Sequence, residues 1–312
     1  EESLDHVTAE SRIGREVETV LDKLEKIRSL EGKNAGRSIL RMIEGGGANE
    51  KIVLFLKSLR NYDDYTFAHS VNVAVISTAT ARHIGFDEAA AGRIGLAALL
   101  HDIGKIYVPR HIIRKNGRLS PSEWQIIRRH PVDGARILQG EDLEEDLWRV
   151  AYEHHMQYDL SGYPNMKEGD SLLDASHIVR IADTYDALTT KRAYRKQISP
   201  YEAIKLMSKT RGSEFHPEYF DTFMHMMGNI PIGSTLELET GETVLVVDIE
   251  GRTGMLPRVK LLRTSEGRPV EGGKIIDLNE IDPRTRKRRY RIIRIENSPV
   301  RDVEIGKYLV RS

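Results

Sequence analysis

The dipeptide His101-Asp102 ends an apolar stretch that runs from Ala89 to Leu100. An aspartate offers two oxygens, so one carboxylate can bridge two cations while the adjacent imidazole binds one of them. Residues of this type recur at intervals of about one helix plus one connection: His69, His101-Asp102, His130, His154-His155 and Asp183. Because an all-helical protein builds a dinuclear centre from side chains on successive helices, the series predicts a helical bundle around a metal site.

Each member of the series also has a simpler interpretation on its own. A single histidine such as His69 is most often a packed or surface residue, and a carboxylate such as Asp183 is often solvated or part of a helix cap. Asp183, however, lies beside a helical stripe of apolar residues: Ile178, Ile181, Ala182 and Tyr185. An unpaired carboxylate there would be costly, and a metal ion would satisfy it. Taken together, the series favours a metal site.

Several motifs in this part of the chain resemble those of HD-GYP domains. They are His101-Asp102-Ile103-Gly104-Lys105, His130-Pro131, His154-His155, Gly162-Tyr163-Pro164, and the segment from Ile181 to Thr190 with Arg192 and Arg195. The resemblance covers roughly residues 50 to 228. It implies an HD-type all-helical bundle and a bacterial, metal-dependent phosphodiesterase that hydrolyses cyclic di-GMP to linear pGpG, GMP or both.

The resemblance also implies a centre of two divalent metal ions, iron or manganese, although zinc and other metals suit the same nitrogen and oxygen ligands. Asp102 is expected to bridge the ions. We expect one ion to be held by His69, His101 and Asp183, and the other by His130, His154 and His155. Two ions about 3.5–4 Å apart would activate a bridging hydroxide for attack on the phosphodiester.

Four residues are expected to contact the substrate. Lys105 follows Asp102 by three positions, where it can stabilise charge in the transition state; its simpler role is that of a cation at a helix C-terminus. Arg192 and Arg195 match family positions that hold the substrate phosphodiesters, a task that suits the forked guanidinium. Tyr163 lies in a turn at the expected mouth of the site, which glycine and proline alone would also explain. The resemblance further implies that this turn contacts a diguanylate cyclase domain.

Three positions depart from the family pattern. Met156 replaces the glutamate that commonly follows the histidine pair, and Leu160 replaces a glycine in the next turn. Tyr65 stands where some members carry a glutamate that supports a third metal, so two metals are expected. The complete ligand series and Lys105 favour an enzyme, whereas Met156 and Leu160 favour a slow or inactive sensor that binds cyclic di-GMP. A third alternative is an HD-type phosphohydrolase that acts on another nucleotide.

Composition argues against several other classes of function. Lys plus Arg and Asp plus Glu number 47 each, so no overall charge points to nucleic acid, and no nucleic-acid partner is expected. The lack of cysteine excludes disulfides and thiolate metal sites and fits a cytoplasmic protein. No apolar run reaches the ~20 residues that span a bilayer. Because the sequence begins at Glu1 without methionine, an upstream membrane or sensor segment can be missing.

The length of 312 residues favours about two domains, and the patterns predict a mainly α fold. Residues 1–48 form a predicted helical segment with apolar positions in heptad spacing over about two heptads: Ile13, Val17, Val20, Leu24 and Ile27. This helix either packs on its own domain or forms a homodimer. Residues 49–228 form the expected catalytic bundle. Residues 229–312 form a small β module, which opens with a hairpin that turns at Thr240-Gly241.

Overall fold

The computed structural model describes residues 37–39, 49–141, 143–165, 171–190, 197–228, 230–248, 256–270 and 272–296. Two sets of residues from the sequence analysis lie outside the described residues: the heptad positions from Ile13 to Ile27, and the two arginines Arg192 and Arg195. Contacts divide the chain into two units, one made of residues 1–187 and 211–222 and the other of residues 188–210 and 223–312. The domain boundary expected after residue 228 stays a prediction.

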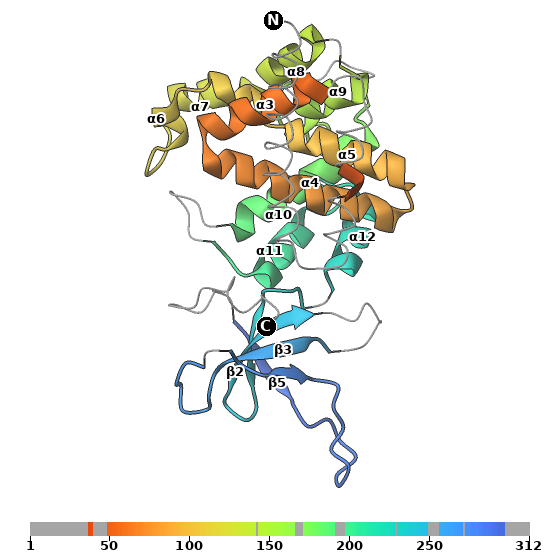
Figure 1. Ribbon diagram of the computed structural model, residues 1–312, viewed down its shortest axis with the longest axis vertical. Helices are drawn as coiled ribbons and strands as arrows, with labels where there is room; N and C mark the ends of the chain where they lie inside the picture. The colour runs from red at the N-terminus through yellow and green to blue at the C-terminus, as the bar shows by residue number, and fades with distance from the viewer. Residues whose placement is uncertain are drawn as a thin grey trace, which may run out of the picture. The chain divides into compact units, whose positions relative to one another are not determined.

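The first unit is built from helices (Figure 1). Their bounds are α3 (Asn49–Tyr62), α4 (Asp64–Ile84), α5 (Glu88–Leu100), the 3-10 helix η1 (Ile103–Tyr107), α6 (Arg110–Ile113), α7 (Pro121–Ile127), α8 (His130–Gly140), α9 (Glu145–Glu153), α10 (Asp174–Thr189) and the start of α12 (Pro217–Met227). None of the helices described in this chain combines the length and the apolar character that are needed to cross a membrane.

Helices α4 and α5 lie side by side at the centre of this unit (Figure 1). Each begins at an aspartate whose side chain caps the helix: Asp63 accepts from the amide of Thr66 at 3.0 Å, and Asp87 accepts from the amide of Ala90 at 2.8 Å. From Ala91 to Leu100, nearly every residue of α5 is buried, as expected for a helix that is apolar all round. The end of α5 therefore carries His101-Asp102 directly into the core.

Local signals of helix starts agree with the structure. Ser120 accepts from the amide of Glu123, and Glu123 accepts from the amide of Ser120, so a capping box begins α7. Ser199 accepts from the amide of Glu202 at 3.2 Å and begins α11 (Pro200–Met207). Both helices have proline at their first position, where its missing N–H has no cost.

The second unit contains a five-stranded antiparallel sheet in the order β4-β3-β2-β1-β5. Its strands are β1 (Thr235–Leu238), β2 (Thr243–Asp248), β3 (Arg258–Arg263), β4 (Ile275–Asp277) and β5 (Ile292–Ile295). Leu236 pairs with Val244 across the predicted hairpin. The fold is thus mainly helical with a small C-terminal sheet, as the sequence predicts.

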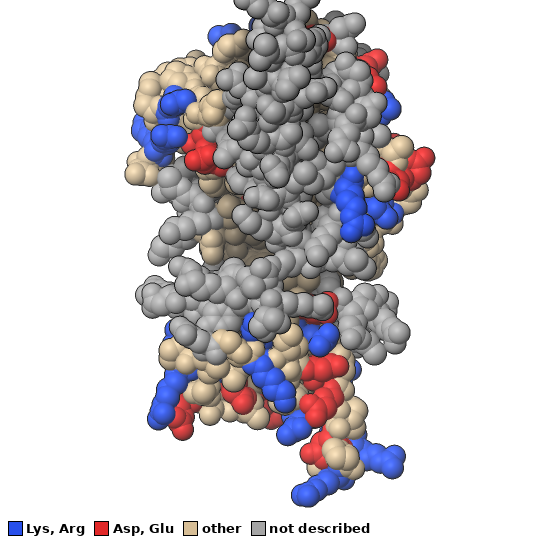
Figure 2. Space-filling model, in the orientation of Figure 1, with Lys and Arg blue, Asp and Glu red and all other residues tan. Residues whose placement is uncertain are grey.

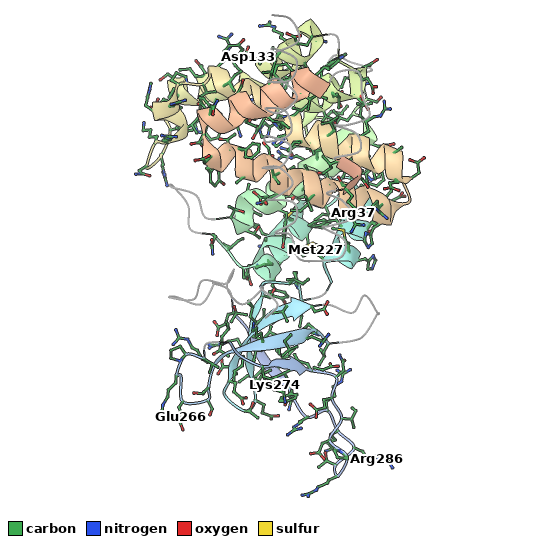
Figure 3. The ribbon with its side chains drawn as sticks, in the orientation of Figure 1. Arg37, Asp133, Met227, Glu266, Lys274 and Arg286 are labelled. Carbon is green, nitrogen blue, oxygen red and sulfur yellow. The ribbon has the colours of Figure 1, made fainter. Side chains whose placement is uncertain are left out.

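Apolar side chains pack on one face of this sheet, and charged side chains of both signs lie on the visible surface. The buried cluster includes Leu236, Leu238, Val244, Val246 and Val259. On the face in Figure 2, lysine and arginine are interspersed with aspartate and glutamate over the described part of this unit. Figure 3 labels Arg286 at the far end of the loop between β4 and β5, where a basic run of the sequence is exposed.

Candidate metal and active site

Seven side chains from five separate parts of the first unit converge at one place. His69 lies in α4, His101 and Asp102 follow α5, His130 begins α8, the pair His154-His155 follows α9, and Asp183 lies in α10. All are buried except His155, which is partly buried. The structure therefore brings together all seven residues that the sequence suggests as metal ligands.

The carboxylate of Asp102 lies between two groups of imidazoles. Its Oδ1 is 3.3 Å from Nε2 of His130 and 3.8 Å from Nε2 of His154. Its Oδ2 is 3.2 Å from Nε2 of His101 and 3.7 Å from Nε2 of His69. Because each oxygen faces a different group, this one side chain is suited to bridge two cations.

Ligand atoms gather around each of the two oxygens. Atoms of His69, His101 and Asp183 lie within 4.8 Å of one another, and Nε2 of His69 is 3.0 Å from Oδ1 of Asp183. Atoms of His130, His154 and His155 form a second such group. A third such group joins His101 and His154 through Asp102, so the expected division between two ions stays a prediction.

Unpartnered buried atoms show that these residues fit a metal ion. Within the described part of the chain, Nε2 of His69, Nε2 of His101 and Oδ1 of Asp102 are buried without a regular hydrogen bond. Buried polar atoms without partners are rare because their desolvation is costly, and an ion or water commonly explains them. Imidazole and carboxylate donors together suit iron, manganese or zinc.

Backbone carbonyls orient three of the imidazoles. The Nδ1 atoms donate to the carbonyl three residues earlier, from His101 to Ala98 at 2.6 Å, from His130 to Ile127 at 2.7 Å and from His154 to Ala151 at 2.9 Å. Each carbonyl belongs to the last turn of a helix, where carbonyls lack helical partners. Because the carbonyl holds a proton on Nδ1, each ring presents its Nε2 lone pair to the site when the ring is neutral.

Asp186 and Asn72 support the fourth imidazole, a role that the sequence analysis missed. Nδ1 of His69 lies 2.6 Å from Oδ2 of Asp186, and Nδ2 of Asn72 donates to Oδ1 of Asp186 at 2.8 Å. The available signal is the spacing of Asp183 and Asp186, since residues three apart share a helix face. A carboxylate behind a histidine is a common way to orient a metal ligand.

The surroundings keep the Asp102 carboxylate and the imidazoles of His130 and His154 unprotonated, so that they can donate electron pairs to a cation. Burial acts to raise the pKa of Asp102, but the charges of His101 and Lys105 outweigh it and hold that pKa well below its usual range. Burial lowers the pKa of His130 and, together with the charge of His101, lowers the pKa of His154 strongly. At neutral pH the carboxylate is therefore ionised and both imidazoles are neutral, as metal ligands must be.

His69 behaves differently from the other histidines. Burial acts to lower its pKa, but the neighbouring carboxylates of Asp183 and Asp186 raise it to about 9. For Asp183, burial acts in the opposite direction and would raise the pKa. Contact with His69 nevertheless holds the pKa of Asp183 well below its usual range. Without metal, a proton on His69 thus compensates the negative charge of this group, and a cation would replace it.

Lys105 contacts the central carboxylate directly. It lies in η1, and its Nζ is 2.5 Å from Oδ2 of Asp102, with 19% of the side chain exposed. Gly104 lets this turn approach the start of α8, because a Cβ there would lie 2.0 Å from the carbonyl oxygen of His130. The ammonium group therefore lies beside the centre, on a side chain that is partly exposed.

The profile of the HD domain family matches residues 54–219, which include all seven converging residues. The chain belongs to the HD domain family. The matched region extends from α3 to the start of α12, and so covers the whole candidate site.

Curated relatives of this HD domain chain act on cyclic dinucleotides. It is similar to a cyclic di-GMP phosphodiesterase of Pseudomonas aeruginosa, with 34% identity over 72% of this chain and 55% of the relative. It is 33% identical to a 3'3'-cGAMP-specific phosphodiesterase of Vibrio cholerae, over 53% of this chain and 34% of the relative. It is 31% identical to a cyclic di-GMP phosphodiesterase of Thermotoga maritima, over 56% of this chain and 49% of the relative. The chain spans about half the length, or less, of these relatives.

The turn after the histidine pair in this HD domain is tightly built. Gly162 has a φ of 103°, and a Cβ there would lie 2.3 Å from the carbonyl oxygen of His155. Leu160 has a φ of 65°, in the left-handed region that costs a leucine about 1–2 kcal/mol. Met156 is buried and pairs with Gly162 through a β-bridge. Both departures from the HD-GYP pattern therefore occupy positions where the backbone or the core constrains the side chain.

His155 has neighbours that set it apart from the other histidines. Nη1 of Arg180 lies 3.3 Å from its Nδ1, and Arg180 is held in turn by Glu214 at 2.5 Å. The ring of Tyr163 stacks on the ring of His155, with centroids 4.6 Å apart and an angle of 29°. The guanidinium carbon of Arg128 lies 4.6 Å from the centroid of Tyr163. Tyr163 thus lies beside the candidate site, and the sequence analysis missed Arg128 and Arg180.

Proposed function

We propose that the chain is a metal-dependent phosphodiesterase that hydrolyses cyclic di-GMP to linear pGpG, GMP or both. The observation that carries the proposal is the carboxylate of Asp102, whose two oxygens face separate groups of imidazoles. The relatives named as cyclic di-GMP phosphodiesterases support the choice of substrate.

The proposed centre holds two divalent ions, iron or manganese, with Asp102 shared between them. His69, His101 and Asp183 would hold one ion, and His130, His154 and His155 the other. When bound, such a pair supplies Lewis acidity to a phosphate oxygen and acidifies a water for in-line attack. The carbonyls and Asp186 behind the imidazoles keep their Nε2 lone pairs directed at this place.

The remaining residues of the proposal bind and orient the substrate. Lys105 can leave Asp102 for a phosphate oxygen as negative charge develops, because its side chain is partly exposed. Tyr163 would close the wall of the site beside His155, and burial raises the pKa of its hydroxyl so that it stays a hydrogen-bond donor. Arg192 and Arg195 are proposed to hold the phosphodiesters through their forked donors.

Two alternatives rest on specific observations. The strained Leu160 and the apolar Met156 favour a slow or inactive sensor that binds cyclic di-GMP. The similarity to 3'3'-cGAMP-specific phosphodiesterases favours a related cyclic dinucleotide as substrate.

Two partner interactions also belong to the proposal: a homodimer through residues 1–48, and contact of a diguanylate cyclase domain with the turn at Tyr163, beside the exposed Tyr158 and Leu160.

The deciding experiment incubates protein loaded with iron or manganese under anaerobic conditions with cyclic di-GMP or 3'3'-cGAMP and follows the products by chromatography. We expect cyclic di-GMP to be cleaved by wild type and not by Asp102→Ala, which should also lose most of its bound metal. Asp133→Ala is the control, because Asp133 lies in α8 and pairs only with surface arginines among the contacts of the described residues. Tight binding of cyclic di-GMP without cleavage at full metal occupancy would establish the sensor instead.

A further inference from the structure

Arg128 is placed at the outer end of a stack of three side chains. Its guanidinium lies over one face of Tyr163, and the ring of Tyr163 lies on His155, with 4.6 Å at each step. Arg128 is exposed, Tyr163 is partly buried, and His155 belongs to the candidate metal centre. The stack therefore leads from solvent to the metal ligands.

The backbone of Arg128 is fixed on both sides. Its amide donates to the carbonyl oxygen of Trp124 at 2.9 Å, which closes the last turn of α7. Two residues later, His130 is held by its Nδ1 donating to the carbonyl oxygen of Ile127. Because this short segment also supplies a candidate ligand, the position of Arg128 is coupled to the geometry of the site.

The charge of Arg128 has no acidic partner within 4.0 Å among the residues that the structure describes. The adjacent Arg129 differs, since its Nη2 lies 3.8 Å from Oδ1 of Asp133. A guanidinium that packs over an aromatic ring keeps the N–H donors along its edges free for an anion. Within the described part of the chain, Arg128 therefore offers an oriented cation beside the site without an acidic partner.

We propose that Arg128 binds the second phosphodiester of a cyclic dinucleotide, the one that stays intact while the first is hydrolysed. This inference rests on the proposed function. A cyclic dinucleotide carries two phosphodiesters on one ring, so when one lies at the metal centre beside Lys105, the other lies further out. Arginine suits that position because its charge persists at all relevant pH values and its planar fork can engage two phosphate oxygens.

The test compares two substrates that differ in their number of phosphodiesters. Cyclic di-GMP has two, whereas bis(p-nitrophenyl) phosphate has one. For Arg128→Gln we expect the KM for cyclic di-GMP to rise roughly 10- to 100-fold, as when a charge-assisted hydrogen bond is lost. We expect a far smaller change in kcat and in the hydrolysis of bis(p-nitrophenyl) phosphate. Arg129→Gln should behave as wild type with both substrates, and Arg128→Lys should fall between Arg128→Gln and wild type.

The possible outcomes separate this inference from the proposed function. An equal loss with both substrates, together with a lower melting temperature, would show that Arg128 only supports the fold around Tyr163 and would overturn the inference. An unchanged KM for cyclic di-GMP would overturn it as well. So would a rise for cyclic di-GMP without one for 3'3'-cGAMP, which would indicate a contact to the base that is guanine in the first and adenine in the second. If wild type cleaves bis(p-nitrophenyl) phosphate but neither dinucleotide, the proposed function fails instead.

Discussion

Nδ1 of His69 lies 2.6 Å from Oδ2 of Asp186, a residue 117 positions further along the chain. The contact joins the N-terminal half of α4 to α10, and Asn72 completes it by donating to the other oxygen of Asp186. His69 directs its opposite nitrogen at Asp183 and Asp102. The carboxylate of Asp186 thus stands behind a candidate metal ligand and sets its orientation.

Replacing Asp186 by asparagine should weaken one metal ion without removing any proposed ligand. We expect the affinity for the ion held by His69 to fall roughly 10- to 100-fold, because a carboxylate behind a ligand imidazole orients the ring and increases its basicity. Competition with a chelator, followed by metal analysis, measures the effect. Asn72→Ala should give a smaller loss, since it leaves the carboxylate in place. Equal metal retention by Asp186→Asn and wild type would contradict this role.

Replacing Lys105 by alanine should separate catalysis from metal binding. If Lys105 neutralises developing charge on the phosphate, kcat should fall roughly 100- to 1,000-fold, as on loss of one preorganised donor, while metal content stays the same. Steady-state kinetics and metal analysis on the same sample test this. Lys115→Ala is a suitable control, because Lys115 pairs with Glu123 at 2.6 Å away from the centre. Activity of Lys105→Ala close to that of wild type would assign Lys105 a purely structural contact with Asp102.

Replacing Leu160 by glycine should stabilise the protein. Leu160 has a φ of 65° and an exposed side chain, so glycine relieves backbone strain and removes little buried contact. Because glycine also gains entropy in the unfolded chain, we expect a net increase in the free energy of unfolding of up to about 1 kcal/mol. Denaturant titration measures it. Leu160→Ala keeps the strain and should give no such gain; a gain of equal size in both variants would refute the argument.

Replacing His177 by glutamine should reduce the sensitivity of the metal-free protein to acid. Burial and the neighbouring His216 lower the pKa of His177 from 6.5 to about 4, against a weaker opposite effect of Asp174. The unfolded chain therefore binds more protons, so the stability that this group contributes is present above pH 6.5 and is lost as the pH falls towards 4. Melting temperatures of both proteins with chelator, across this range, should converge or cross in acid.

The exposed His111 provides the control for that experiment. His111→Gln should follow the wild-type dependence of melting temperature on pH, because its ring is not buried against another imidazole in the described structure. If His177→Gln also follows wild type, then the cluster of His177, His216, Tyr158 and Tyr219 tolerates a proton, and its packing does not oppose one.

A helix start, a hairpin turn and the series of candidate ligands could each be predicted from the sequence. The serine at 120 and the glutamate at 123 determine a helix start through bonds that span three residues. The Thr240-Gly241 turn lies between strands that pair as predicted. The ligand series could be recognised because histidine and aspartate are costly to bury without a partner, and their spacing of one helix and one connection directs them to a common core.

The other features of the candidate site depend on contacts between segments that are far apart in the sequence. No spacing rule reveals that the ring of His69 meets Asp186, that Arg128 lies over Tyr163, or that each oxygen of Asp102 faces a different group of imidazoles. The sequence by itself determined which side chains can bind metal and which helices carry them. Only the tertiary structure decided which nitrogen each imidazole presents and which charges remain unpaired, because those properties depend on directions and distances between atoms that packing of the helices brings together.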